Sequence, residues 1–328
     1  MKEEDVRPKW IFDNYLELAA TDSQTYFRRG EKEKINCPAC NNTGEFSFSK
    51  NGFNYEECEV CFTLFVSPRP LAKAFNKYYT EAPSVKYWAT TFYKETEEAR
   101  RELLWKPKAE LIKKTMEYWG DSSELSTVVD IGGGYGIFAE EIKTLTGISP
   151  VIIEPGPELA NICKGKGFNV IEKFLESLNV SDLPKSRKVF VSFELFEHLH
   201  SPEEFLINLS KLMLPQDMFI FTTLSGVGAD ISVLWERSKS VSPPHHLNFF
   251  NPKSIQILLK RLGFETLEIS TPGKLDIDIL KNSEELITDR FWKRFISLAS
   301  EEHKIIMQKA LKDTCFSSHL MVVCRKFE

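Results

Sequence analysis

The chain has 328 residues, which is enough for about two domains. Hydrophobic residues make up 42% of it and charged residues 27%, as in an ordinary folded protein, so a disordered or fibrous chain is excluded. The net charge of -5 disfavours a general nucleic-acid binder, because such proteins use a basic excess to neutralise phosphates. No apolar run reaches the ~18 residues needed to span a bilayer, and residues 1–10 lack the apolar centre of a secretory signal. We expect a cytoplasmic protein.

Changes of pattern along the chain predict four parts. Residues 1–36 are polar apart from an amphipathic stretch, which predicts an N-terminal helical segment with an apolar side made of Trp10, Ile11, Phe12, Tyr15, Leu16 and Leu18. Residues 37–70 hold short strand-like runs between turn residues. Residues 71–125 have helical spacing and predict a helical cap or linker of two or three helices. The last part, residues 126–328, is the main domain.

The main domain alternates strand-like apolar runs with helical patterns, which indicates βαβ units and a mostly parallel sheet. An additional helical segment, Ser283–Lys312, precedes the last strand. The fold class is therefore α/β with a doubly wound sheet. Its expected strands are Val128–Ile131, Val151–Ile153, Val189–Phe193, Phe219–Thr222, Leu267–Ser270 and Leu320–Arg325.

Four of the seven cysteines form two C-x-x-C pairs, Cys37 with Cys40 and Cys58 with Cys61. The spacing between the pairs falls in the window of about 15–20 residues that is typical of zinc ribbons. Each pair presents two thiolates from a tight turn, and four sulfurs complete a closed tetrahedron around a structural Zn²⁺. We expect a Cys₄ zinc ribbon over residues 37–70, with metal binding supplying much of its folding energy.

A glycine-rich turn follows the first strand of the main domain. Gly132, Gly134 and Gly136 let the backbone adopt positive φ and approach a ligand closely, and the helix that follows offers free N–H groups. The next strand ends in Glu154, whose carboxylate can accept both hydroxyls of a ribose. This arrangement predicts a nucleotide-type ligand.

Two such ligands compete for this turn. Gly134-x-Gly136-x-x-Ala139 fits a relaxed dinucleotide fingerprint, which allows NAD. Asp130, however, stands just before the glycines, where its charge would oppose a pyrophosphate and favour a sulfonium with a free amino group. The pattern favours S-adenosylmethionine.

From about Thr127 to Lys326, the chain resembles class I S-adenosylmethionine-dependent methyltransferases. Asp130 and the glycines match the family's cofactor loop, Glu154 matches its ribose-binding acid, and Val189–Leu199 matches the strand and turn that face the methyl group. The resemblance implies a Rossmann-like sheet of seven strands. It also implies cofactor contacts from Asp130, Gly132, Gly133, Gly134, Tyr135, Gly136, Glu154, Pro155 and Phe193, and adenine contacts from Phe174 and Leu175.

Candidate catalytic residues cluster in two segments. Glu194, Glu197 and His198 are spaced so that one helical turn would aim all three the same way, and His245 and His246 follow two prolines further along. A histidine here could act as the general base that removes a hydroxyl proton. The Glu-x-x-Glu-His run also resembles O-methyltransferases that hold a divalent ion with such residues and a later histidine, so a second metal at the active site is an alternative.

Other residues have weaker signals. The aromatic stripe Tyr78, Tyr79, Tyr87, Trp88, Phe92 and Tyr93 is expected in the core, with a lid over a polar ring as the alternative. Arg100 and Arg101 are expected on a solvated helix face, with binding of a substrate phosphate as the alternative. His200 and His303 are expected on the surface, and His319 at a strand end.

The zinc ribbon together with this domain resembles methyltransferases of bacterial sugar and polysaccharide biosynthesis. The resemblance predicts O-methylation of a saccharide, a nucleotide-sugar or a related small metabolite, with no membrane or nucleic-acid partner. Three other functions are considered: an RNA- or protein-modifying methyltransferase that docks its substrate on the ribbon, a non-catalytic scaffold with this fold, and an NAD enzyme.

Overall fold

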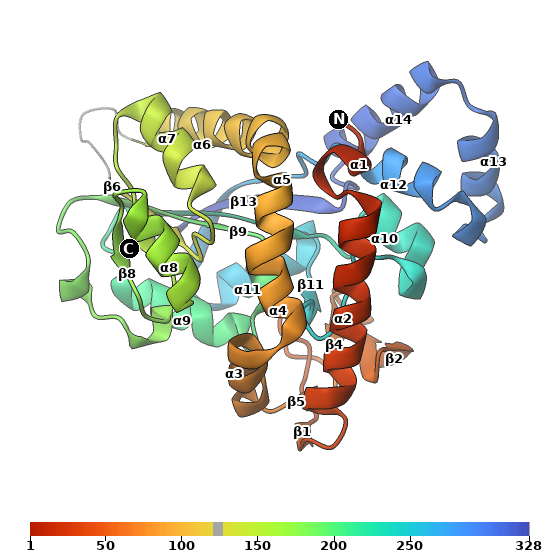
Figure 1. Cartoon of the computed structure of the whole chain (residues 1–328), viewed down its shortest axis with the longest axis horizontal. Coiled ribbons are helices and arrows are strands. Elements are labelled where there is room, and N and C mark those ends of the chain that lie inside the picture. The colour runs from red at the N-terminus through yellow and green to blue at the C-terminus, as the bar shows by residue number, and fades with distance from the viewer. Residues whose placement is uncertain (121–126, 328) are drawn as a thin grey trace.

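The computed structural model describes residues 1–120 and 127–327 and is built around one seven-stranded sheet (Figure 1). The four neighbouring pairs from β10 to β8 are parallel, whereas β13 runs antiparallel to both β10 and β12. This sheet confirms the predicted fold class. In sheet order the strands are β12 (Phe264–Ser270), β13 (His319–Lys326), β10 (Met218–Leu224), β9 (Lys188–Phe193), β6 (Thr127–Ile131), β7 (Val151–Ile153) and β8 (Asn169–Ile171).

The six strands expected from the sequence all form, and β8 is the one that the pattern did not reveal. It has three residues and none of them is fully buried, so it carries no apolar run. The chain order reverses at β6, whose neighbours are β7 on one side and β9 on the other. In open α/β sheets such a switch point, at the carboxyl ends of the strands, is where ligands bind.

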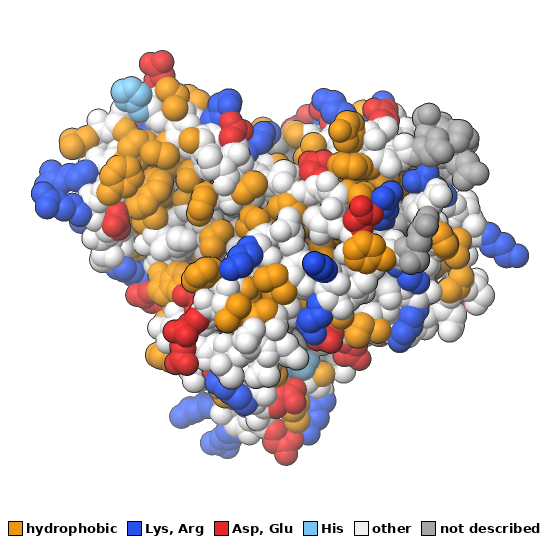
Figure 2. Space-filling view, turned by 180° about the vertical axis from the view of Figure 1, so that it is seen from behind, with side chains coloured by type: hydrophobic (Ala, Val, Ile, Leu, Met, Phe, Trp, Pro, Cys, Tyr) orange, Lys and Arg blue, Asp and Glu red, His pale blue; other side chains and the backbone are white. Residues whose placement is uncertain are grey.

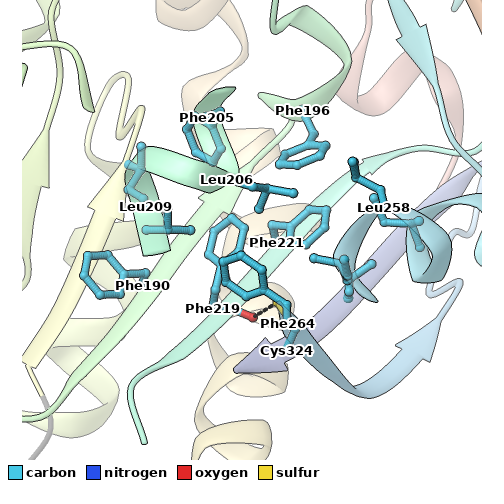
Figure 3. Packing of buried hydrophobic residues seen from close by; sticks show 14 of the residues in the cluster. Phe190, Phe196, Phe205, Leu206, Leu209, Phe219, Phe221, Leu258, Phe264 and Cys324 are labelled. Atoms are coloured by element: carbon cyan, nitrogen blue, oxygen red, sulfur yellow. Dashed lines mark hydrogen bonds between the residues drawn. The ribbon is translucent and has the colours of Figure 1, made fainter. Parts of the chain in front are cut away.

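Helices cover both faces of the sheet because apolar side chains point from the strands to both sides. One face packs against α6 (Lys106–Trp119) and α7 (Ile137–Thr146), and α8 (Pro157–Gly165) lies beside α7. The other face packs against α9 (Pro202–Leu212) and α11 (Pro252–Arg261), with Phe190, Phe219 and Phe221 in the centre of the cluster (Figure 3).

The N-terminal part and the cap are helical, as expected. Helix α2 (Lys9–Phe27) follows the short α1 (Glu3–Val6), and α3 (Ala72–Glu81) opens the cap. Contiguous helical segments then run from Pro83 to Trp119: α4 (Pro83–Tyr87), the π-helical η1 (Trp88–Phe92), α5 (Tyr93–Arg100), the π-helical η2 (Arg101–Trp105) and α6. The predicted boundary between residues 125 and 126 lies outside the described residues.

The cysteine ribbon is a small antiparallel sheet that the main domain completes. Its strands are β2 (Glu45–Lys50), β3 (Phe53–Glu57) and β4 (Leu64–Val66), and β11 (Asn248–Phe249) from the main domain pairs with β4. A second pair joins β1 (Lys32–Glu33) to β5 (Arg69–Pro70). Three of the cysteines and Phe65 belong to the same apolar cluster as Phe250 and Ile255. The ribbon therefore has no separate core.

Short helical elements complete the main domain. They are η3 (Leu175–Ser177), η4 (Val180–Asp182), η5 (Phe196–His198), α10 (Ala229–Leu234), η6 (Trp235–Arg237), α12 (Asp276–Asn282), η7 (Glu284–Leu286), α13 (Arg290–Leu298) and α14 (Glu301–Asp313). The last three confirm the extra helical segment expected over Ser283–Lys312. Helices α13 and α14 project from the body, and hydrophobic side chains gather on this projection beside basic ones (Figures 1 and 2). No helix in residues 1–120 or 127–327 is long and apolar enough to cross a membrane.

The shared core predicts that the ribbon and the main domain unfold together. Replacing the fully buried Phe65 by alanine should lower the free energy of unfolding by about 3–5 kcal/mol, because it leaves a cavity between the two parts. Calorimetry should show one transition at a lower temperature. Phe46→Ala, at a ribbon position 65% exposed, is the control and should change little. Two separate transitions would contradict the shared core.

Candidate functional site

The glycine turn lies at the carboxyl end of β6, next to the switch point of the sheet. Gly132, Gly134 and Gly136 have φ of 73°, 54° and 73°, which residues with a side chain rarely adopt. Gly133 has an ordinary φ, but a Cβ there would stand 2.7 Å from the Ile152 side chain. The sequence predicted that this turn needs glycines. Positive φ requires three of them, and close packing against Ile152 requires Gly133.

Asp130 is a buried carboxylate without a full set of partners. Its side chain is 1% exposed, and Oδ2 has no hydrogen-bond partner among the described residues. Burial and the nearby Glu154 raise its pKa to about 7. A cationic ligand in this turn would supply the missing partner, as expected for a sulfonium with an amino group.

Glu154 is held by the glycine turn. Its Oε2 accepts a hydrogen bond from the Gly134 backbone N–H at 3.0 Å, and its Oε1 accepts one from Gly156 at 2.9 Å. Burial raises its pKa despite these two bonds. The carboxylate is thus fixed where β7 ends, the position expected for the ribose-binding acid.

A small cavity lies over the turn and is closed by aromatic residues of the cap. Tyr93 stacks on Tyr135 with ring centroids 5.5 Å apart, and Trp105 meets the Phe193 ring edge-on at 6.0 Å. The cap is therefore part of the site, which supports the lid alternative for Tyr93. The residues around the cavity are Tyr93, Trp105, Asp130, Gly132, Gly133, Tyr135, Ile137, Phe138 and Phe193.

Ion pairs tie the cap to the cofactor turn. Arg101 contacts Glu140 and Glu141 on α7, each at 2.7 Å, and Glu97 on its own helix at 3.0 Å. Lys166 donates to the Tyr135 carbonyl at 2.9 Å and also pairs with Glu140. These contacts hold the cap above the turn.

The remaining predicted cofactor residues lie apart from this cavity. Pro155 follows Glu154 and is half-buried, Phe174 is 58% exposed, and Leu175 is buried in the core beside α9. Their contacts with adenine stay a prediction.

Glu194 is engaged by residues other than the catalytic candidates. Its φ of 52° and the 3₁₀ turn that follows break the single α-helical turn that the spacing suggested. Its Oε1 accepts hydrogen bonds from Thr222 Oγ1 at 2.7 Å and Lys108 Nζ at 3.2 Å, and His319 Nε2 lies 3.4 Å away. Burial would raise the pKa of Glu194, but the nearby His319 and Lys108 and these hydrogen bonds keep it below its usual value.

Glu197, His198 and His246 do come together. One candidate ligand atom from each lies within 4.8 Å of the others. Glu197 is fully buried and accepts a hydrogen bond from Thr223 Oγ1 at 2.8 Å. Burial and the charge of Glu194 raise the pKa of Glu197 to about 8. Two imidazoles and a carboxylate are a donor set that fits a divalent cation.

The two histidines of this group are held in one tautomer. Nδ1 of His198 lies 3.1 Å from the His245 carbonyl, and Nδ1 of His246 lies 2.5 Å from the Ser240 carbonyl. A carbonyl can only accept, so each Nδ1 carries the proton and each Nε2 keeps a free lone pair. Burial lowers the pKa of His198 to about 4 and that of His246 to about 3.

His245 does not join them. It is buried, and its Nε2 lies 2.5 Å from the Tyr78 hydroxyl, between the rings of Tyr15, Tyr78 and Tyr79. Its backbone carbonyl positions His198 instead.

Two residues of the site carried no signal of a role there. Lys108 and His319 both contact the carboxylate of Glu194, yet Lys108 lies in the cap and His319 starts the last strand, as expected for His319. Arg100, expected on a solvated face, is only 8% exposed. His200 is half-buried rather than on the surface, because its Nε2 lies 2.9 Å from the Pro70 carbonyl, whereas His303 is exposed as expected.

The four ribbon cysteines also meet as predicted. Sγ–Sγ distances are 3.5 Å for Cys37–Cys61, 3.4 Å for Cys40–Cys58 and 3.5 Å for Cys61–Cys40. Sulfurs this close, around one centre, fit the tetrahedral ligand set of a zinc ribbon.

The chain is similar to known methyltransferases. The sequence matches the family of methyltransferase domains over residues 99–269, and it matches no curated protein. Similar solved structures include the plantazolicin methyltransferase BpumL in complex with SAH, 14% identical, with a TM-score of 0.49, covering 77% of this chain and 93% of that one. A SAM-dependent methyltransferase from Archaeoglobus fulgidus is 17% identical, with a TM-score of 0.46, covering 72% of this chain and 100% of that one. The O-methyltransferase of a Brevibacillus brevis multienzyme, in complex with S-adenosyl-L-homocysteine, is 14% identical, with a TM-score of 0.46, covering 72% and 76%.

The family match spans more than half of the chain, so the chain belongs to the methyltransferase-domain family. It is an S-adenosylmethionine-dependent methyltransferase, as the glycine turn, Asp130 and Glu154 indicated.

Asp130 predicts a pH dependence of cofactor binding. Its raised pKa leaves about one tenth of the carboxyl ionised at pH 6 and most of it at pH 8, so binding of S-adenosylhomocysteine should weaken about tenfold between pH 8 and pH 6. Calorimetric titration measures this, and Asp130→Asn should bind weakly with a flat profile.

The raised pKa of Asp130 affects stability in the opposite direction from cofactor binding: ionisation favours binding but disfavours the ligand-free fold. Because the folded-state pKa of Asp130 exceeds the ordinary value of 3.8, its ionisation lowers the stability of the ligand-free protein progressively as pH rises from about 4 to about 7, and the loss is complete above pH 7. Asp130→Asn should therefore raise the free energy of unfolding at pH 8 by about 2–4 kcal/mol. A destabilised Asp130→Asn protein would show that the carboxylate is structural.

Proposed function

We propose that this methyltransferase transfers the methyl group to a hydroxyl of a small polar metabolite, such as a saccharide or a nucleotide-sugar. The observation that carries the proposal is the histidine pair His198 and His246. Both imidazoles are neutral at physiological pH, and both keep a free Nε2 lone pair beside the carboxyl ends of β9 and β10. A hydroxyl acceptor needs such a base, because its proton must leave as the new bond forms.

The chain's residues have separate tasks in this step. S-adenosylmethionine, when bound, supplies a methyl group whose bond to sulfur breaks as the acceptor oxygen attacks the carbon. Asp130 and Glu154 hold the donor, the cap excludes water, and a histidine Nε2 takes the hydroxyl proton. Glu194, already paired with Lys108 and hydrogen-bonded by Thr222, positions the turn and is not proposed as the base.

The enclosure of the site supports a small acceptor. Tyr15 of α2 lies 5.5 Å from the His245 ring, and Tyr78 and Tyr79 of the cap cover the same residue. A chain of RNA would need an open basic groove. The strand β11 of the main domain completes the ribbon's own sheet, which supports a structural role for the ribbon rather than a docking arm.

We further propose that Zn²⁺ occupies the four-cysteine cluster as a structural metal. The short sulfur–sulfur distances are the supporting observation, because four thiolates in one centre repel each other without a cation.

Asparagine variants test the histidine base. Asparagine keeps an N–H near the Nδ1 position but has no Nε2 lone pair, so His198→Asn and His246→Asn preserve the local hydrogen bond. Replacing whichever histidine is the base should lower kcat by a factor of about 10²–10⁴. Turnover is measured as S-adenosylhomocysteine released with a panel of saccharides and nucleotide-sugars. Binding of S-adenosylhomocysteine should not change. His303→Asn, at an exposed position on α14, is the control.

Chelation separates the base from a metal-assisted reaction. Wild-type turnover that survives EDTA, with the ribbon zinc retained, fits a histidine base. Turnover that EDTA removes and Mg²⁺ or Mn²⁺ restores would assign Glu197, His198 and His246 to a divalent ion instead. Full turnover in both asparagine variants would refute the histidine base and the metal-assisted reaction alike.

Metal analysis tests the zinc proposal. We expect about one zinc per chain, and Cys58→Ser should lose it and melt at a lower temperature, because structural zinc contributes folding energy directly. Cys315→Ser, outside the cluster, should keep both the zinc and the melting temperature. A chain without zinc that melts like wild type would overturn the assignment.

A further inference from the structure

Arg100 is a buried cation in the cap without a counter-ion. Its side chain is 8% exposed, and Nε is buried without a hydrogen-bond partner among the described residues. No ion pair or hydrogen bond joins its guanidinium to any residue in the described part of the chain. Arginine stays charged in proteins and has five N–H donors. Burying such a group without hydrogen-bond acceptors costs free energy.

Two aromatic rings hold this guanidinium in place. Its central carbon lies 5.5 Å from the Phe92 ring centroid and 5.9 Å from that of Tyr93. Such rings attract a cation through their faces but do not satisfy the N–H groups in its plane. The donors of Arg100 are therefore positioned and free.

The position is next to the cofactor cavity, because Arg100 lies against the Tyr93 ring and Tyr93 lines that cavity. A Cβ on Gly134 would lie 3.4 Å from the Tyr93 hydroxyl. Burial lowers the pKa of Arg100, and the carboxylate of Glu194 offsets this only in part. Glu194 is not its partner, because Lys108, Thr222 and His319 already occupy that carboxylate.

A second arginine lies near the first. Arg7, just after α1, stacks on Phe12 at 5.5 Å, and its guanidinium has no hydrogen-bond partner among the described residues. Phe12 packs on Phe92 with ring centroids 6.3 Å apart, and Phe92 carries Arg100, so the two guanidiniums lie on neighbouring aromatic rings.

We propose that Arg100, with Arg7 beside it, binds an oxyanion on the acceptor, so that the substrate is a phosphorylated or carboxylate-bearing metabolite. Guanidinium N–H groups match the oxygens of phosphates and carboxylates in pairs. An oxyanion there would anchor the acceptor next to His198 and His246, with its hydroxyl free to react. The role as an acceptor site rests on the proposed function, whereas oxyanion binding does not.

The test uses two simple probes on the full chain. Inorganic phosphate and acetate are titrated at constant ionic strength with saturating S-adenosylhomocysteine, so that the cofactor's own carboxylate site is filled, and the melting temperature is recorded. We expect a saturable rise with one of them: phosphate if the acceptor is phosphorylated, acetate if it carries a carboxylate. Arg100→Met should weaken that response at least ~10-fold, as for one lost charge-assisted pair. Arg294→Met, at a basic position on α13, should respond like wild type.

Two further measurements separate the alternatives. Without any anion, Arg100→Met should melt at the same temperature as wild type or higher, because the substitution removes an uncompensated buried charge. Its affinity for S-adenosylhomocysteine should stay within about threefold of wild type, which corresponds to less than one charge-assisted bond.

Several results would overturn the proposal. An equal probe response in Arg100→Met and wild type, or no saturable response to either probe, would remove the oxyanion site. A tenfold loss of S-adenosylhomocysteine binding in Arg100→Met would assign the arginine to the cofactor's carboxylate. If wild type binds a probe but not S-adenosylhomocysteine, the proposed function fails and the oxyanion site stands.

Discussion

The buried side chain of Arg69 joins the three segments on which the site depends. It is 1% exposed and donates to the carbonyls of Val66, His200 and Leu247 and to the Asn248 side chain at 2.8 Å. These acceptors belong to the ribbon, to the loop after the 3₁₀ turn η5, and to the segment that ends in β11. One guanidinium thus ties parts that are distant in sequence, and its burial is tolerated because its donors have partners.

This junction explains how the histidine pair is aligned. The Leu247 N–H donates to the Glu197 carbonyl at 2.7 Å, and the Val66 N–H donates to the Leu247 carbonyl at 2.9 Å. The ribbon strand β4, the His246 segment and the Glu197 turn therefore form one hydrogen-bonded unit. A structural zinc at the far end of the ribbon would stiffen the same unit. The ribbon thus fixes one wall of the site through these hydrogen bonds.

Local signals made part of this site predictable. Cysteine spacing, glycines after a strand and an acid at the next strand end are patterns within a few residues, and the structure places them as expected. The roles of Arg69, Lys108 and His319 were not predictable, because each depends on partners brought together only by the fold. Glu194 shows the limit of spacing: its positive φ breaks the helical turn that would have grouped it with Glu197 and His198, and its carboxylate binds Lys108 and Thr222 instead.

The two buried arginines, Arg69 and Arg100, differ in whether the fold supplies hydrogen-bond acceptors for their guanidinium groups. This difference separates a structural role from a ligand-binding role. Both have lost water, which is tolerable for an arginine only when acceptors replace it. Arg69 has acceptors from three segments, so the fold accounts for it. Arg100 has aromatic faces but no acceptor among the described residues, and it lies against Tyr93, which lines the cofactor cavity. The fold leaves its donors free, so an anionic ligand is the partner that would explain why an arginine stands there.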